Sequence, residues 1–220
     1  MSEPSQRYQA VSAEINAANA DDPRTIVVDG IERPYEVVYS ERMLQRLTVM
    51  YPEASELLRI AALGQHIRRF DIPRTQFAAG RDGYNAWRRA CREHHARLLN
   101  DIMSRHGYDR REIEHVAKLV KKEQLKKDKE SQALENVVDV VFLDHYFDEF
   151  YGKYSYDDAK IIDIIGKTLR KMSPKGHQAA LALDLPERTR KLVLDAVEQE
   201  REQPEQEEVD LARELAQRFL

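Results

Sequence analysis

The sequence has little cysteine, few glycines and prolines, and no long apolar run. Its 220 residues include a single cysteine, Cys91, so an internal disulfide framework is excluded. No apolar stretch approaches the roughly 20 residues that span a bilayer, and the first ten residues, MSEPSQRYQA, contain no apolar signal core. With 42% hydrophobic residues, 34% charged residues, 8 glycines and 8 prolines, the composition is typical of a soluble helical protein. We therefore expect a cytoplasmic chain without a membrane segment.

The charge balance also excludes a broad class of partner. The chain carries 39 acidic and 35 basic residues, a net charge of −4, which argues against a general nucleic-acid binder. Local clusters of basic residues leave recognition of an RNA end open. The expected partner is a small phosphorylated molecule or a nucleotide.

The apolar periodicity predicts an all-α fold. Helices are expected over residues 8–20, from Pro34 to Tyr51, over 54–67, 84–106 and 132–151, and from Asp109, Asp158, Pro174 and Pro186 onward. The strand-like run at 25–32, with a turn at Asp29-Gly30, predicts a loop or a small hairpin. Because the helices are short and no heptad persists, we expect one orthogonal multi-helix domain over residues 1–185. Residues 186–220 form a helical extension with an acidic tail, which is expected to dock on the domain or to bind a protein partner.

Residues 69–83 form a predicted loop of about 15 residues, a length that often carries function. Arginines crowd this loop and the helix after it, and guanidinium groups bind phosphate through charge and fork geometry. Tyr84 and Trp87 could stack on a base or a sugar, although Trp87 could equally be a core anchor. Most lysines are expected on a solvated face. The candidate substrate-binding residues are Arg69, Arg74, Arg81, Tyr84, Trp87, Arg88, Lys126 and Lys171.

Three of the seven histidines, His66, His95 and His145, lie on helices that are expected to be central. A metal site needs imidazole and carboxylate ligands that converge from separate helices, and Glu135 and Asp139 share one helix face because they are four residues apart. No spacing such as HExxH supports a metal, so each imidazole could instead be satisfied in the core. The candidate metal ligands are His66, His95, Asp139 and His145.

Eight stretches between about residues 10 and 185 are distinctive. They are NAANADDP, YSERM, QHIRRFDIPR, GRDGYNAWR, HHARLL, LVKKEQLKKD, QALENVVDVVFLDHYF and KTLRKMSPKGHQAAL. Together they resemble a bacterial and fungal family called domain of unknown function 4202. The family usually has Asp where this chain has Asn136, which implies one carboxylate fewer here.

More remotely, the helices between residues 54 and 151 resemble the HD-domain phosphohydrolase superfamily. That resemblance implies a ligand at Gln65-His66, another at His95, a polar group at Lys122-Glu123 and a carboxylate at Glu135 or Asp139. This chain departs from the superfamily because it has no His-Asp doublet. Metal would then bind through altered ligands, or a phosphate pocket has been kept without the metal.

Three functions remain open from the sequence. The first is an HD-like phosphohydrolase in which a divalent ion (Mg, Mn, Fe or Co), or lysines such as Lys122 in its place, neutralises the phosphate while Glu123 or Glu135 orients water. The second is a non-catalytic binding protein for an anionic nucleotide or an RNA end. The third is a helical scaffold that recruits a partner through its acidic tail.

Overall fold

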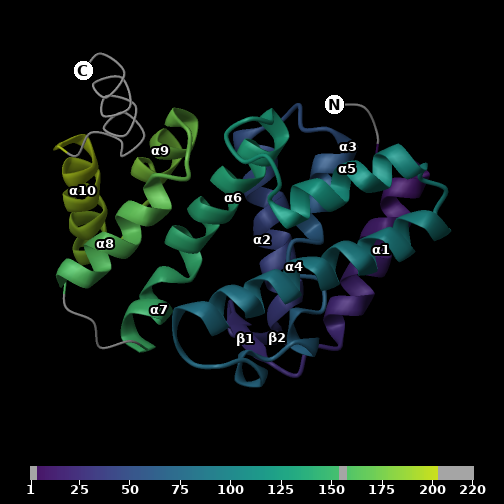
Figure 1. The fold of residues 1–220 in the computed structure, drawn as a ribbon, viewed down its shortest axis with the longest axis horizontal. Coiled ribbons are helices and arrows are strands. Elements are labelled where there is room, and N and C mark those ends of the chain that lie inside the picture. Colours follow the sequence, from purple (N-terminus) through teal and green to yellow (C-terminus); the bar gives the residue numbers. More distant parts are fainter. Residues whose placement is uncertain (1–3, 154–157, 203–220) are drawn as a thin grey trace, which may run out of the picture. The chain divides into compact units, whose positions relative to one another are not determined.

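The computed structural model describes residues 4–153 and 158–202, and it confirms the all-α prediction (Figure 1). Two compact units divide the chain, residues 1–141 and residues 142–220. The predicted domain boundary after residue 185 stays a prediction, and residues 203–220 of the acidic tail lie outside the described residues. None of the described helices is both long enough and apolar enough to cross a membrane.

Unit 1, residues 1–141, is a helical bundle with a small hairpin near its N-terminus (Figure 1). Its elements are α1 (Gln6–Ala20), β1 (Thr25–Val28), β2 (Ile31–Pro34), α2 (Tyr35–Met50), α3 (Glu56–Leu63), α4 (Gly80–Arg105), α5 (Arg110–Lys121) and most of α6 (Lys129–His145), with short 3-10 turns at Arg69–Asp71 and Arg74–Gln76.

Local side-chain chemistry explains where these elements begin. Ser55 accepts a hydrogen bond from the Leu58 amide at 3.0 Å and caps α3. Asp109 and Glu112 form a reciprocal capping box at the start of α5. At the hairpin tip Asp29 and Gly30 both have positive φ, 52° and 77°, which is the backbone of the predicted tight turn.

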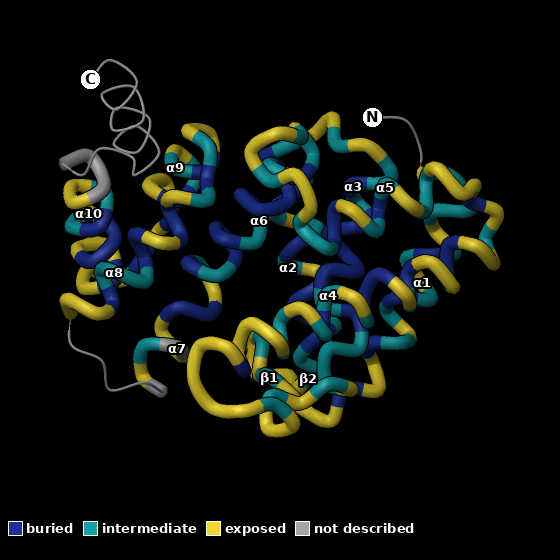
Figure 2. Tube along the Cα trace, viewed as in Figure 1, coloured by how far each residue is buried: buried dark blue, intermediate teal, exposed yellow. Residues whose placement is uncertain are grey.

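The core of unit 1 forms where α3 packs against α1, α2 and α5. Because α3 is apolar almost all round, it is buried on most of its surface. Figure 2 shows the burial of each segment along the chain. The fully buried side chains include Ile15, Met43, Leu47, Ile60, Met103, Val116 and Val120.

Several helix boundaries differ from the predicted ones. α3 ends at Leu63 instead of 67, and α4 begins at Gly80, four residues before the predicted start. α5 ends at Lys121, because the Lys122 and Glu123 amides bond back to the carbonyls of Leu119 and Lys118 and close the helix end. The predicted helix over 132–151 is interrupted near Tyr146, so that α7 (Phe147–Lys153) is separate.

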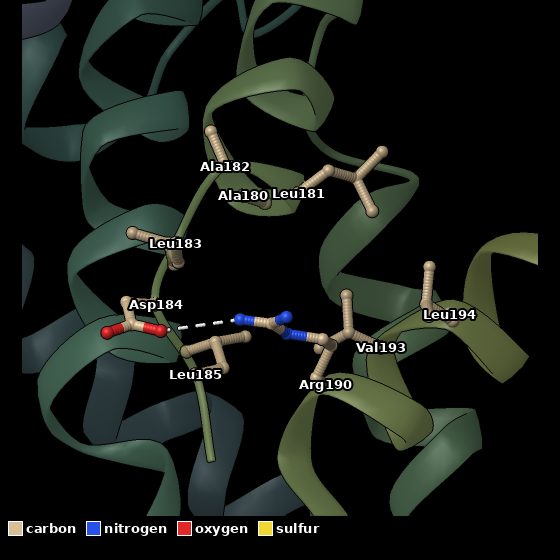
Figure 3. A pocket seen from close by; sticks show the side chains of 9 residues that line it. All are labelled: Ala180, Leu181, Ala182, Leu183, Asp184, Leu185, Arg190, Val193 and Leu194. Atoms are coloured by element: carbon tan, nitrogen blue, oxygen red, sulfur yellow. Dashed lines mark hydrogen bonds and ion pairs between the residues drawn. The ribbon is translucent and has the colours of Figure 1, made fainter. Parts of the chain in front are cut away.

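Unit 2, residues 142–220, contains α7, α8 (Asp158–Leu169), α9 (Pro174–Leu181) and α10 (Glu187–Glu202). α8 packs against α10. Pro174 occupies the first turn of α9, as predicted. A pocket of about 270 Å³ lies between the end of α9 and α10, and an ion pair of 3.4 Å between Asp184 and Arg190 crosses it (Figure 3).

Candidate functional site

A tight turn over residues 64–69 follows α3 and carries His66. A Cβ on Gly64 would lie 2.5 Å from Cδ2 of Leu99, so only glycine lets α4 pass this close to the end of α3. His95 lies one turn before Leu99 on α4 and therefore also faces the turn. As a result the ring centroids of His66 and His95 are 6.0 Å apart.

Asn19, at the end of α1, fixes this turn from the other side. Its buried Nδ2 donates to Ser40 Oγ at 2.9 Å, and its Oδ1 accepts from the Arg68 amide at 2.9 Å. Ser40 Oγ donates in turn to the Leu63 carbonyl at 2.8 Å. Arg68 has φ 48°, a left-handed conformation. The hydrogen bond from its backbone amide to Asn19 helps to hold this conformation. Three helices thus set the position of the turn.

Glu36 lies directly beside His66. Its side chain is fully buried in α2, with Oε2 3.4 Å from Nδ1 of His66. Arg24 Nη2 donates to Oε1 of Glu36 at 2.6 Å. Burial raises the pKa of Glu36 to about 7, although the hydrogen bond from Arg24 opposes the rise. The His66 ring also stacks on Tyr39, at 3.9 Å between centroids and 11° between planes.

Both histidines are held in the neutral form. Burial lowers the pKa of His66 well below its ordinary value, and the charges of Arg69 and Lys122 lower it further. Burial also lowers the pKa of His95. The His66 side chain remains 21% exposed, so solvent or a ligand can reach it. His95 is 1% exposed, and among the described residues neither of its ring nitrogens makes a hydrogen bond of good geometry.

Three arginines lie around these histidines. The Arg69 guanidinium stacks 4.5 Å from the Trp87 ring centroid, and its charge acts on Glu36, His66 and His95. Arg88 follows Trp87 on α4 and also acts on His66. Arg92, one turn further, has a pKa lowered by burial and by Arg88. Within residues 4–153 and 158–202, none of these three guanidinium groups pairs with a carboxylate at 4.0 Å or less. The excess positive charge is suited to an anionic ligand.

Lys122 supplies a fourth cation at the end of α5. Its Nζ lies 2.6 Å from Oε2 of Glu135, which is buried in α6. Burial lowers the pKa of Lys122, while the charges of Glu135 and Asp139 oppose this shift. Asp139 is also buried and lies one turn after Glu135, so the two carboxylates share a helix face as predicted. Lys122 has φ 61°, an uncommon backbone conformation for a residue other than glycine.

The structure gives different environments to the other predicted residues of unit 1. Trp87 Nε1 donates to the Ile72 carbonyl at 2.8 Å, and Arg74 donates to the Phe77 carbonyl at 2.9 Å, so both hold the loop. The remaining predicted residues of this unit are exposed on its surface. These are Arg81, Tyr84, Glu123 and Lys126.

Two predicted site residues, His145 and Lys171, belong to unit 2. His145 Nε2 lies 3.5 Å from Oδ2 of the adjacent Asp144, and Lys171 is half-buried. Across the described residues, no group of three or more His, Cys, Asp or Glu side chains is arranged to hold a metal ion. The predicted metal set of His66, His95, Asp139 and His145 is therefore not found as one cluster, and metal binding stays a prediction.

Sequence reasoning missed Glu36, Arg24 and Arg92. A signal for Glu36 exists, because it lies in register with the apolar stripe of Met43 and Leu47 on α2. A carboxylate in such a stripe must be buried, and a buried carboxylate needs a partner. Arg24 carries no such signal, since its contact depends on how the hairpin folds back beside α2.

These residues form one polar site inside unit 1. It combines a carboxyl–imidazole pair whose carboxyl group is bound by Arg24, a second neutral imidazole, and four further cations. Three of these four lack a carboxylate partner in the part of the chain that the structure describes. Such a site can bind an anion and can accept or donate a proton near neutral pH. Comparison with curated proteins and with solved structures finds no match. The model of one family, described as Domain of unknown function (DUF4202), matches residues 9–193, and the chain therefore belongs to that family.

Proposed function

We propose that unit 1 binds a phosphoester and hydrolyses it at the site between α2, the turn after α3, and α4. One observation carries the proposal. The charge of Arg69 acts on Glu36, His66 and His95 together, while its own guanidinium has no carboxylate partner among the described residues. A phosphate bound to Arg69 would lie beside a proton-accepting pair.

Binding would rest on the positive charge of the site and on its burial, which excludes solvent. Arg69 and Arg88 would take the phosphate oxygens, with Lys122 adding positive charge from the end of α5. An anion here would also favour the protonated forms of His66 and His95, because it opposes the arginine charges that now lower their pKa values. Ligand binding should therefore raise the pKa of His66 toward its ordinary value, which makes the neutral imidazole a stronger base.

The chemical step needs a base that is neutral before reaction. His66 meets this requirement, because burial keeps its pKa low. With Nδ1 turned toward Glu36, Nε2 would take a proton from water as the water oxygen attacks phosphorus. The phosphorus–oxygen bond to the alcohol then breaks, and the departing oxygen takes a proton back from His66. Glu36 would stabilise the transient imidazolium.

The remote resemblance to HD-domain phosphohydrolases is part of this proposal. It implies that a divalent ion such as Mg, Mn, Fe or Co could share the work of the arginines, with His66 and His95 among its ligands. In that scheme Glu135 would orient water, whereas the predicted alternative, Glu123, is exposed on the surface. The family membership alone assigns no activity.

The Lys122–Glu135 pair favours a second candidate function. Lys122 Nζ lies 2.6 Å from the carboxylate of Glu135, the group to which the resemblance gives the role of orienting water. A carboxylate that is already paired with a lysine fits a binding site better than a hydrolytic one. The alternative is a non-catalytic protein that binds an anionic nucleotide or an RNA end with the same arginines.

Metal analysis and a phosphate-release assay test the proposal. The purified protein is analysed for bound metal and then assayed with nucleotides and simple phosphoesters, with Mg, Mn, Fe, Co or EDTA. We expect His66→Gln to lower kcat by about 100-fold or more, and Arg69→Gln to raise KM by about tenfold. The matched controls are His115→Gln and Arg110→Gln, whose side chains pair with Glu130 and Glu114 at the surface of α5.

The outcomes separate the candidates. Release of phosphate that depends on His66 and Arg69 but not on the control positions supports hydrolysis. Arg69-dependent binding without turnover under any metal condition favours the binding protein. A protein that neither binds nor hydrolyses any member of the panel contradicts both.

A further inference from the structure

Four side chains at the start of α4 and in the preceding loop form a row in which two neighbouring aromatic rings lie between two cations. The Arg69 guanidinium lies 4.5 Å from the Trp87 ring centroid. The Trp87 and Tyr84 centroids are 5.7 Å apart, with 46° between the rings. Arg88 lies 5.8 Å from the Tyr84 centroid. We call this set, Arg69–Trp87–Tyr84–Arg88, the aromatic ladder.

The ladder is fixed on its inner side. Trp87 Nε1 donates to the Ile72 carbonyl at 2.8 Å, which ties the ring to the loop. A Cβ on Gly83 would lie 1.8 Å from the Ala78 carbonyl oxygen, so the first turn of α4 packs directly on the loop backbone. Trp87 is therefore a structural member of the ladder, although it is only half-buried and does not belong to the core.

The outer side of the ladder is open. Tyr84 is 45% exposed, the only aromatic ring among the large hydrophobic side chains that are exposed in the described residues. The charges of both arginines at the ends of the ladder act on His66. A partly exposed aromatic ring thus lies next to the cations of the anion site.

We infer that the ligand is a phosphoester with a planar aromatic group, whose ring stacks on Tyr84 while Arg69 and Arg88 hold its phosphate. This rests on the proposed function and names its substrate class. Tyr84 sets specificity, because its exposed face can receive a ring and stacking tolerates any planar π-system. A phosphoester without a ring would gain the charge contacts only.

The single tryptophan of the chain, Trp87, makes the inference directly measurable. Its fluorescence is titrated with adenosine 5′-monophosphate and with ribose 5-phosphate, two esters that share the sugar and the phosphate and differ in the ring. We expect the adenosine ester to bind about tenfold more tightly. Tyr84→Ala should abolish that difference, and Tyr84→Phe, which keeps the ring and removes only the hydroxyl, should preserve it.

Equal affinities for the two esters in the unaltered protein would overturn the inference, and so would a preference that survives Tyr84→Ala. In both cases Arg69-dependent binding of the phosphate would leave the proposed function standing. If neither ester binds, both the inference and the proposed function fail. Because Tyr84 is exposed, the substitution should leave the melting temperature nearly unchanged, and this is checked first.

Discussion

Replacing Glu36 by Gln should change how the stability of unit 1 depends on pH. Burial raises the pKa of Glu36 from an ordinary 4.5 to about 7 in the folded chain. Between these pH values the folded protein holds a proton that the unfolded chain has released. The stabilising contribution of Glu36 is therefore complete below pH 4.5 and is lost as pH rises to 7. A shift of this size corresponds to roughly 3 kcal/mol.

Glu36→Gln removes this contribution, because glutamine does not titrate. The free energy of unfolding is measured in urea at several pH values from 4.5 to 8 for the unaltered protein and the variant. As pH rises from 4.5 to 8, the free energy of unfolding of the variant should increase by roughly 3 kcal/mol relative to that of the unaltered protein. His66 and His95 act in the opposite direction, since their lowered pKa values cost stability as pH falls below 6.5.

His95 contributes equally to the pH dependence of both proteins, so its contribution cancels when the variant is compared with the unaltered protein. The contribution of His66 is coupled to Glu36 through their 3.4 Å contact, so the experiment is repeated in a His66→Gln background. The reasoning would be refuted if the difference in unfolding free energy between variant and parent stayed constant within about 0.5 kcal/mol from pH 4.5 to 8. A constant difference would mean that the Arg24 hydrogen bond keeps the pKa of Glu36 near 4.5.

Three further substitutions test the frame of the site by urea unfolding. Lys122→Met should cost about 3–5 kcal/mol because it breaks a buried ion pair, and adding Glu135→Gln should restore most of the loss; an unchanged midpoint would contradict the pairing. Gly64→Ala should cost about 1–3 kcal/mol, since its Cβ meets Leu99 at 2.5 Å, and a neutral effect would show that Leu99 can move aside. Asp109→Ala should cost about 1 kcal/mol through loss of the capping box, whereas Asp109→Asn should cost less.

The sequence predicts most of the helices because their ends depend on local chemistry. Ser55, Asp109 and Pro174 each mark a helix start, and the Asp29-Gly30 turn fixes the hairpin. The burial of α3 follows from its apolar composition. The pairing of Glu135 and Asp139 on one face of α6 follows from their spacing alone.

The composition of the site depends on packing that has no local signal. α5 ends at Lys121 and is closed by a left-handed Lys122, a position where glycine is favoured, so no glycine marks this helix end in the sequence. The crossing of α3 and α4 depends on the fit between Gly64 and Leu99, which are 35 positions apart (99 − 64). Arg24 reaches Glu36 only after the hairpin has folded. Each of these contacts becomes visible only when distant segments are brought together.

The Asn19 amide has a consequence for how the chain opens. It joins α1 to the turn that carries His66 across 49 positions of sequence, through the Arg68 amide. When α1 detaches, the Arg68 amide loses its acceptor and the turn loses its support, even though α3 and α4 keep their own hydrogen bonds. The Arg68 amide should therefore exchange with deuterium only as fast as α1 undocks. Through Asn19, α1 therefore stabilises a site to which it contributes no reactive group.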